Sequence, residues 1–204
     1  MNLLENLTPE NLVARGLHWE NPPINWEALP GGGMRVRVPG KVDYFRDPAG
    51  VNVKEDAPYL WRMAKGDFVA RAHVRPTWAT TWDAGALMAW ADPSHWCKLC
   101  YERTDLGTTA AVSVVTNGLS DDANGANLTA PDLWLQLCRV GNVFGMHYAL
   151  DGESWKMVRV FQLPVPEAIR VGLVAQCPAG PGIEIDFLHF SLEARTVQQL
   201  RAGI

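Results

Sequence analysis

Short segments in which apolar and polar residues alternate recur along the chain, and β-branched and aromatic residues are concentrated in them. Clusters of Gly, Pro, Asn and Asp separate these segments at intervals of roughly ten residues, which is typical of all-β proteins. Helical periodicity is nearly absent. The pattern predicts about eleven strands, at residues 34–39, 59–64, 67–74, 85–91, 96–103, 110–117, 133–140, 143–150, 155–161, 170–177 and 183–194.

This number and spacing of strands favours a two-sheet antiparallel β-sandwich, a jelly roll, over a small barrel. Helix is expected only near the chain ends. Thr8, Pro9 and Glu10 supply a polar N-cap and an N1 proline, so a short N-terminal helix is predicted to run to about Arg15. A second helical turn is expected at residues 196–203.

The stretch "YALDGESWKMV" contains an Asp-Gly pair between two alternating segments. A sialidase-type Asp box would need an aspartate at the position of Leu150, whereas here Asp151 directly precedes Gly152. Asp-Gly is a strong signal for a tight turn with positive φ. The stretch is therefore interpreted as a β-hairpin.

The chain of 204 residues is 48% hydrophobic, enough to bury a sizeable core in one domain. We expect the sandwich to span residues 18–194, with an N-terminal extension at 1–17 that carries the short helix and a C-terminal tail at 195–204.

The net charge is −4 and the basic residues are scattered, so no surface for nucleic acid is indicated. The N-terminus lacks a basic region followed by an apolar run, and no segment reaches membrane-spanning length. A soluble, cytoplasmic protein with neither a nucleic-acid nor a membrane partner is expected.

Four cysteines are too few for a secreted disulfide framework. Cys97 and Cys100 form a C-x-x-C, but the surrounding "HWCKLCYER" has the pattern of a strand, in which residues three apart point to opposite faces. No second ligand pair supplies the four ligands of structural zinc. Buried free thiols are expected, and no metal site.

A set of ordered motifs runs from His18 to about Glu193. Together they resemble the family called domain of unknown function 1349, which includes regulation of enolase protein-like sequences. The motifs are "WENPP" at 19–23, "VDYFRD" at 42–47, "APYLWR" at 57–62 with "GDF" at 66–68, "WDAGALM" at 82–88, "HWCKLCYE" at 95–102, "SVVTNGLSD" at 113–121 and "LDGESW" at 150–155.

The resemblance implies a concanavalin A-like lectin/glucanase sandwich, whose concave face binds sugar in many relatives. It implies no known reaction. The chain departs from the family pattern at three positions, where Ala84 replaces Gln, Trp90 stands where Arg is common, and Asp122 replaces Trp.

Alternation along the strands indicates candidate ligand-binding residues. In 96–103 it places Trp96, Lys98 and Glu102 on one face, and in the strands 133–140 and 143–150 it sets polar residues opposite apolar rows. Sugars are bound by aromatic platforms together with amides or carboxylates. The candidates for one concave face are Tyr44, Trp90, Trp96, Lys98, Glu102, Trp134, Gln136 and His147. The alternative is that the tryptophans fill the core and that Lys98 and Glu102 form an ordinary ion pair.

Catalysis would require two carboxylates facing each other. Asp83 and Glu102, with Lys98 near them, are the candidate catalytic groups of a glycoside hydrolase or lyase. The "EIDF" segment at 184–187 resembles the start of a glucanase motif, but Leu188 and His189 occupy the place of its third acid.

Asp121, Asp122, Asn124 and Asn127 are interpreted as a loop rich in oxygen atoms, where calcium is possible and a solvated turn is favoured, so no cofactor is expected. The sequence favours a protein that binds a small carbohydrate-like ligand. An enzyme using Asp83 and Glu102 and a regulatory or self-associating domain, such as a homodimer, are the two alternatives.

Overall fold

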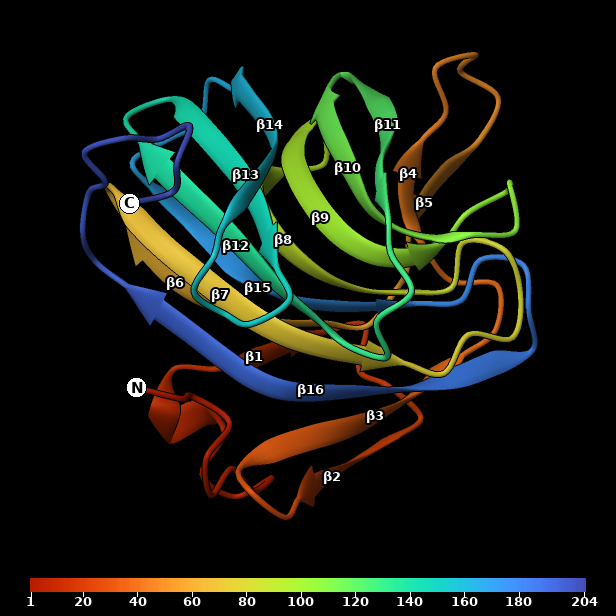
Figure 1. Ribbon diagram of the computed structural model, residues 1–204. Coiled ribbons are helices and arrows are strands. Elements are labelled where there is room, and N and C mark those ends of the chain that lie inside the picture. Colours follow the sequence, from red (N-terminus) through yellow and green to blue (C-terminus); the bar gives the residue numbers. More distant parts are fainter.

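A computed structural model describes residues 1–204, and it consists almost entirely of antiparallel strands (Figure 1). Two seven-stranded sheets pack face to face as a jelly-roll sandwich. In spatial order, the first sheet contains β1 (His18–Glu20), β6 (Tyr59–Lys65), β15 (Ala168–Gln176), β8 (Ala84–Asp92), β9 (His95–Arg103), β10 (Thr109–Asn117) and β11 (Leu119–Asn127). The second contains β14 (Lys156–Gln162), β13 (Val143–Ala149), β12 (Leu133–Val140), β7 (Phe68–Pro76), β16 (Gly182–Glu193), β3 (Gly33–Pro39) and β2 (Asn25–Leu29).

The eleven predicted strands are all present, each within two residues of its predicted bounds. Five further strands were missed: β1, β2, β11 and the two strands of a small separate sheet, β4 (Tyr44–Arg46) and β5 (Val53–Glu55). The predicted hairpin at Asp151 is confirmed, since β13 pairs with β14. Gly152 has a φ of 76°.

The predicted N-terminal helix is wrong, because only the 3-10 turn η1 (Val13–Arg15) forms. The Asn11 side chain accepts a hydrogen bond from the Thr8 N–H and donates one to the Asn6 carbonyl, and such side-chain bonds compete with helix formation. Leucines of the first seventeen residues instead enter the main core. At the other end, residues 199–204 form a hydrogen-bonded turn and no helix.

Alternation along β9 divides its side chains between two buried environments. Cys97, Leu99 and Tyr101 point into the core between the sheets, whereas Trp96 and Cys100 belong to a second apolar cluster on the outer face of the first sheet. The two cysteines are free and buried on opposite faces, as the strand pattern predicted.

The β4–β5 hairpin covers part of this outer face. Tyr44 packs edge-on against Trp96 with ring centroids 6.2 Å apart, and the Arg46 backbone N–H donates to Ser120 Oγ at 2.9 Å. In Figure 1 the hairpin stands on the inner side of the curved ribbons of β9 and β10. The outer face of the first sheet is therefore a covered, concave surface. No helix of the structure is long and apolar enough to cross a membrane.

Candidate ligand-binding site

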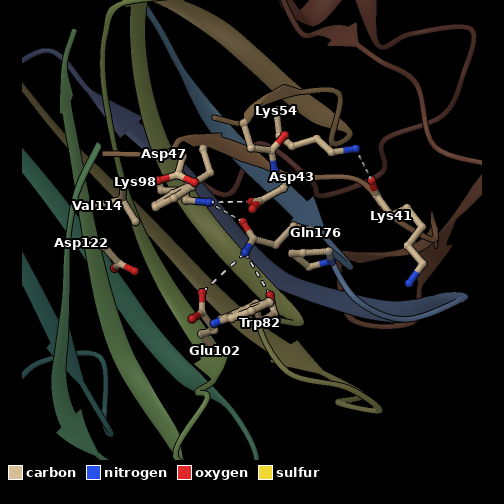
Figure 2. Close-up of a pocket in the computed structure, with 13 residues that line it drawn as sticks. Lys41, Asp43, Asp47, Lys54, Trp82, Lys98, Glu102, Val114, Asp122 and Gln176 are labelled. Atoms are coloured by element: carbon tan, nitrogen blue, oxygen red, sulfur yellow. Dashed lines mark hydrogen bonds and ion pairs between the residues drawn. The ribbon is translucent and has the colours of Figure 1, made fainter. Parts of the chain in front are cut away.

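A cavity of about 320 Å³ lies between the outer face of the first sheet and the segments around the β4–β5 hairpin. Nine of its thirteen lining residues are polar or charged (Figure 2). The lining residues are Lys41, Asp43, Phe45, Asp47, Asn52, Lys54, Trp82, Lys98, Glu102, Val114, Asp122, Gln176 and Pro178.

Lys98 is the centre of a buried polar network in this cavity. Its side chain is only 2% exposed, and its Nζ lies 2.9 Å from Asp43 Oδ1 and 2.7 Å from Gln176 Oε1. Burial opposes the charge, but Asp43, together with Cys100 and Glu102, raises the pKa of Lys98 above its ordinary value. The ammonium is therefore charged and joins β9 to β15 and to the segment that precedes β4.

Glu102 lies on the same face of β9 and is 6% exposed. Its single hydrogen-bond partner is Gln176, whose Nε2 lies 3.5 Å from Glu102 Oε2. Burial, reinforced by the charge of Asp122 and opposed by that of Lys98, raises the pKa of Glu102 well above its ordinary value of 4.5. Glu102 is thus a buried carboxyl group that faces the cavity with unused hydrogen-bonding capacity.

Asp122 reaches the cavity from β11, which was interpreted as a loop from the sequence. Alternation along the strand sends Asp121 to the opposite side, where its Oδ2 lies 2.8 Å from Arg159 Nη2. The two aspartates therefore do not converge on one ion, and no cluster of three or more His, Cys, Asp or Glu residues could hold a metal. Asp122 is exposed as a residue, but partial desolvation of its carboxyl group at the cavity raises its pKa above the ordinary value.

Trp82 forms part of the cavity rim and is 46% exposed. Its backbone has a φ of 67°, which is costly for a residue that is not glycine. Two hydrogen bonds hold this conformation: the Trp82 N–H donates to the Arg103 carbonyl at 2.7 Å, and Gln176 Nε2 donates to the Trp82 carbonyl at 3.0 Å. Figure 2 shows Trp82 beside Glu102.

The predicted candidates on the first sheet divide into two groups. Lys98 and Glu102 line the cavity. Trp96 is fully buried, and Tyr44 is packed between Trp96 and Tyr59, so these rings form an aromatic cluster beside the cavity. Trp90 packs against the same cluster, and its ring lies 4.6 Å from the Arg170 guanidinium, outside the cavity lining.

The expectation that Trp134, Gln136 and His147 share this face is wrong, because β12 and β13 belong to the second sheet. The C-terminal segment covers two of these side chains: Gln136 Nε2 donates to the Gly203 carbonyl at 2.9 Å, and His147 Nε2 lies 2.9 Å from the Leu200 carbonyl oxygen.

Trp134 lies on the same outer face of the second sheet and stacks on His73 with ring centroids 4.5 Å apart. Alternation places a residue on one face of its own strand, but it does not say to which sheet the strand belongs.

The proposed pairing of Asp83 with Glu102 is also not formed. Ala84 is directly opposite Glu102 in the sheet, so alternation turns Asp83 to the other face. There Asp83 Oδ2 accepts hydrogen bonds from the Ala79 and Thr80 N–H groups at 2.9 and 2.6 Å. The Asp83 carboxylate closes a local turn and does not line the cavity.

Several cavity residues were not identified from the sequence. Asp43 and Asp47 lie within "VDYFRD", which was noted only as part of a family pattern. Alternation in the strand 170–177 puts Gln176 on the same face as Val174, but only the strand order brings it to the cavity. Trp82, in contrast, has no local signal, since its place at the rim depends on an unusual backbone conformation.

Comparisons with known proteins agree with this architecture. A family model described as "Protein of unknown function (DUF1349)" matches residues 19–195. The chain is 28% identical over 181 residues to Regulation of enolase protein 1 of Saccharomyces cerevisiae, covering 86% of this chain and 88% of that protein. A crystal structure of a functionally unknown protein from Saccharomyces cerevisiae matches with a TM-score of 0.82 and 26% identity, over 89% of this chain and 98% of that one.

More distant structures share the fold alone. The GH43 BlXynB protein from Bacillus licheniformis has a TM-score of 0.73 at 14% identity, over 95% of this chain and 39% of that one. The exoplasmic/lumenal domain of VIP36, in its Ca²⁺/Man3GlcNAc-bound form, has a TM-score of 0.57 at 10% identity, over 98% of this chain and 91% of that one. The lectin-like and glycosidase-like neighbours confirm the predicted sandwich class.

Proposed function

The chain belongs to the DUF1349 family, and we propose that its cavity beside the β4–β5 hairpin binds a small carbohydrate or another polyhydroxylated molecule. The single observation that carries this proposal is the Glu102 side chain. It is almost fully buried, it faces the cavity, and its one hydrogen bond to Gln176 is 3.5 Å long. A buried carboxyl group without a good partner is costly, and a ligand hydroxyl would supply that partner.

The rest of the lining matches the chemistry of hydroxyl groups. Lys98 donates hydrogen bonds, and Gln176 both donates and accepts them, so the lining offers donors and acceptors next to each other. A hydroxyl can donate one bond and accept two, which allows it to join such a network in either direction. The exposed ring of Trp82 adds an apolar surface at the rim.

The size of the cavity fits a small ligand. Its volume of about 320 Å³ lies at the lower end of the roughly 300–1,000 Å³ found for ligand sites. The sugar-bound form of VIP36 adds a fold-level analogy, which supports a carbohydrate without choosing which one.

Thermal shift and calorimetry with neutral mono- and oligosaccharides test the proposal. A ligand that binds only the folded state raises its melting temperature. Glu102→Gln should weaken binding several-fold, because the amide replaces one of the two carboxyl oxygen atoms by an NH2 group, and a hydrogen bond between neutral groups contributes about 0.5–1.5 kcal/mol. Glu27→Gln, an exposed residue on β2 of the other sheet, is the matched control and should bind normally. Unchanged binding in Glu102→Gln would contradict the proposal.

A carbohydrate-active hydrolase or lyase is the second candidate. The observation that favours it is the raised pKa of Glu102, since a general acid has to hold a proton near neutral pH. Cleavage of a chromogenic glycoside, retained in Asp83→Asn and lost in Glu102→Gln, would support an enzyme in which Asp83 has no catalytic role.

A further inference from the structure

The cavity lining holds four carboxyl groups, those of Asp43, Asp47, Glu102 and Asp122, and three lysines. Lys98 is the one fully buried cation, and its closest carboxylate is Asp43 at 2.9 Å. Glu102 and Asp122 line the same cavity, and neither forms an ion pair with a basic side chain of the chain. Asp47 also lines the cavity and forms no ion pair, so three carboxyl groups there lack a direct cationic partner.

The lysines at the rim do not correct this imbalance. Lys41 Nζ donates to the Ala179 carbonyl. Lys54 Nζ donates to the Lys41 carbonyl at 3.0 Å and lies 3.4 Å from Asp56. Figure 2 shows both side chains at the hairpin end of the cavity, away from Glu102.

From this charge distribution we infer that the ligand carries a protonated amino group beside its hydroxyls, as an amino sugar does. This inference rests on the proposed function and names its ligand class. Glu102 and Asp122 would share the ammonium through charge-assisted hydrogen bonds, while Lys98 and Gln176 bind the hydroxyls. Trp82, whose exposed indole lies beside Glu102, offers an aromatic face that attracts a cation.

The titration of the two carboxyl groups supports the same ligand. Burial raises the pKa of Glu102, and partial desolvation raises the pKa of the more exposed Asp122, so both carboxyl groups take up a proton more readily than free carboxylates do. The other titratable groups around Glu102 are Lys98 and Cys100 on its own strand, Asp43 before β4 and Asp105 after β9. A bound ammonium would take the place of the proton.

Three sugars test whether the ligand's charge or its shape decides binding: glucosamine, glucose and N-acetylglucosamine. Only glucosamine carries an ammonium group, because acetylation makes the amine neutral. Calorimetry at pH 7 should show glucosamine binding at least ten-fold more tightly than either neutral sugar. Asp122→Asn should reduce this preference several-fold. Asp121→Asn, its neighbour on the opposite face of β11, is the control and should retain the preference. Equal affinity for glucosamine and glucose would overturn the inference and leave the proposed function standing.

Two further probes make the outcomes distinguishable. If ethanolamine binds and no sugar does, the site binds an ammonium group and the proposed carbohydrate function is wrong. If none of these molecules raises the melting temperature, both the inference and the proposed function are wrong. Across pH 5 to pH 7 affinity for glucosamine should increase with pH, because any deprotonation of Glu102 and Asp122 favours the bound ammonium. A decrease over that range, or a calcium-induced stabilisation that blocks glucosamine, would overturn the inference.

Discussion

Lys98 Nζ lies 2.9 Å from Asp43 Oδ1, so a buried ammonium on β9 is tied to the segment that enters the β4–β5 hairpin. The side chains are 2% and 16% exposed. This contact joins the floor of the cavity to its cover, and it is the only ion pair of the first sheet's outer face with a fully buried partner.

Removing one partner of this ion pair should destabilise the fold more than removing both partners together. Lys98→Met and Asp43→Asn should each lower the free energy of unfolding by about 3 kcal/mol or more, because one buried charge loses its partner. The double variant should lose much less than the sum. Urea unfolding followed by tryptophan fluorescence measures this coupling. The exposed pair Lys65 and Glu167, 3.8 Å apart, is the control, and its two substitutions should be additive. Additivity at Lys98 and Asp43 would contradict the finding that burial couples them.

The raised pKa of Glu102 predicts how stability changes with pH. Between its ordinary value of 4.5 and its raised folded value, the folded state holds a proton that the unfolded state has lost. The contribution of Glu102 to the free energy of unfolding is therefore fully present below pH 4.5. It is lost as the pH rises toward and through the raised pKa of the folded state. Glu102→Gln cannot lose this proton, so its stability relative to the unsubstituted protein should increase from pH 5 to pH 8. Urea unfolding across this range checks the sign. A fall in this relative stability over the same range would contradict a raised pKa at Glu102.

Asp83 should prove to be structural. Asp83→Ala removes the acceptor for the Ala79 and Thr80 N–H groups and should destabilise the fold by about 1–3 kcal/mol. Ligand affinity, measured by calorimetry below the melting temperature, should stay within two-fold. Asp151→Ala is a useful comparison, because Asp151 also accepts from two backbone N–H groups but on an exposed hairpin, so its loss should cost less. A large loss of affinity in Asp83→Ala would return this residue to the candidate site.

The C-terminal segment should contribute to stability through Gly203. This glycine has a φ of 74°, and a Cβ there would lie 2.5 Å from Gln136 Nε2. Gly203→Ala should therefore combine backbone strain of about 1–2 kcal/mol with a steric clash. Gly107→Ala has a similar φ of 77° and open space around it, so it should show the strain alone. Thermal unfolding of the two variants compares them, and equal melting temperatures would mean that the C-terminal segment is not held against Gln136.

The fold could be predicted from the sequence because each long strand shows a clear alternation of apolar and polar residues. The period of two in β9 assigned Cys97 and Cys100 to opposite faces correctly. Strands of only three residues, such as β4 and β5, are too short for their alternation to be detected. The N-terminal helix failed because tertiary packing of leucines and local side-chain bonds outweighed a good capping sequence.

The site was only half predicted, for a different reason. Lys98 and Glu102 lie on one strand, and alternation alone brings them together. Gln176 and Asp122 reach the same cavity from β15 and β11, which requires the order of strands in the sheet. The same missing information led to Trp134 and His147 being placed on this surface. Sheet order arises from contacts between distant segments, which a single sequence does not display.

The hairpin 44–55 forms a sheet of its own and shares no backbone ladder with either main sheet. Substitutions at Phe45, Asp47, Asn52 or Lys54 therefore change the cavity without breaking a strand pairing of the sandwich. The hairpin side of the cavity is therefore encoded separately from the sheet side, which carries Lys98, Glu102, Asp122 and Gln176. Exchanging the hairpin between relatives is consequently a direct way to vary one wall of the cavity on an unchanged framework.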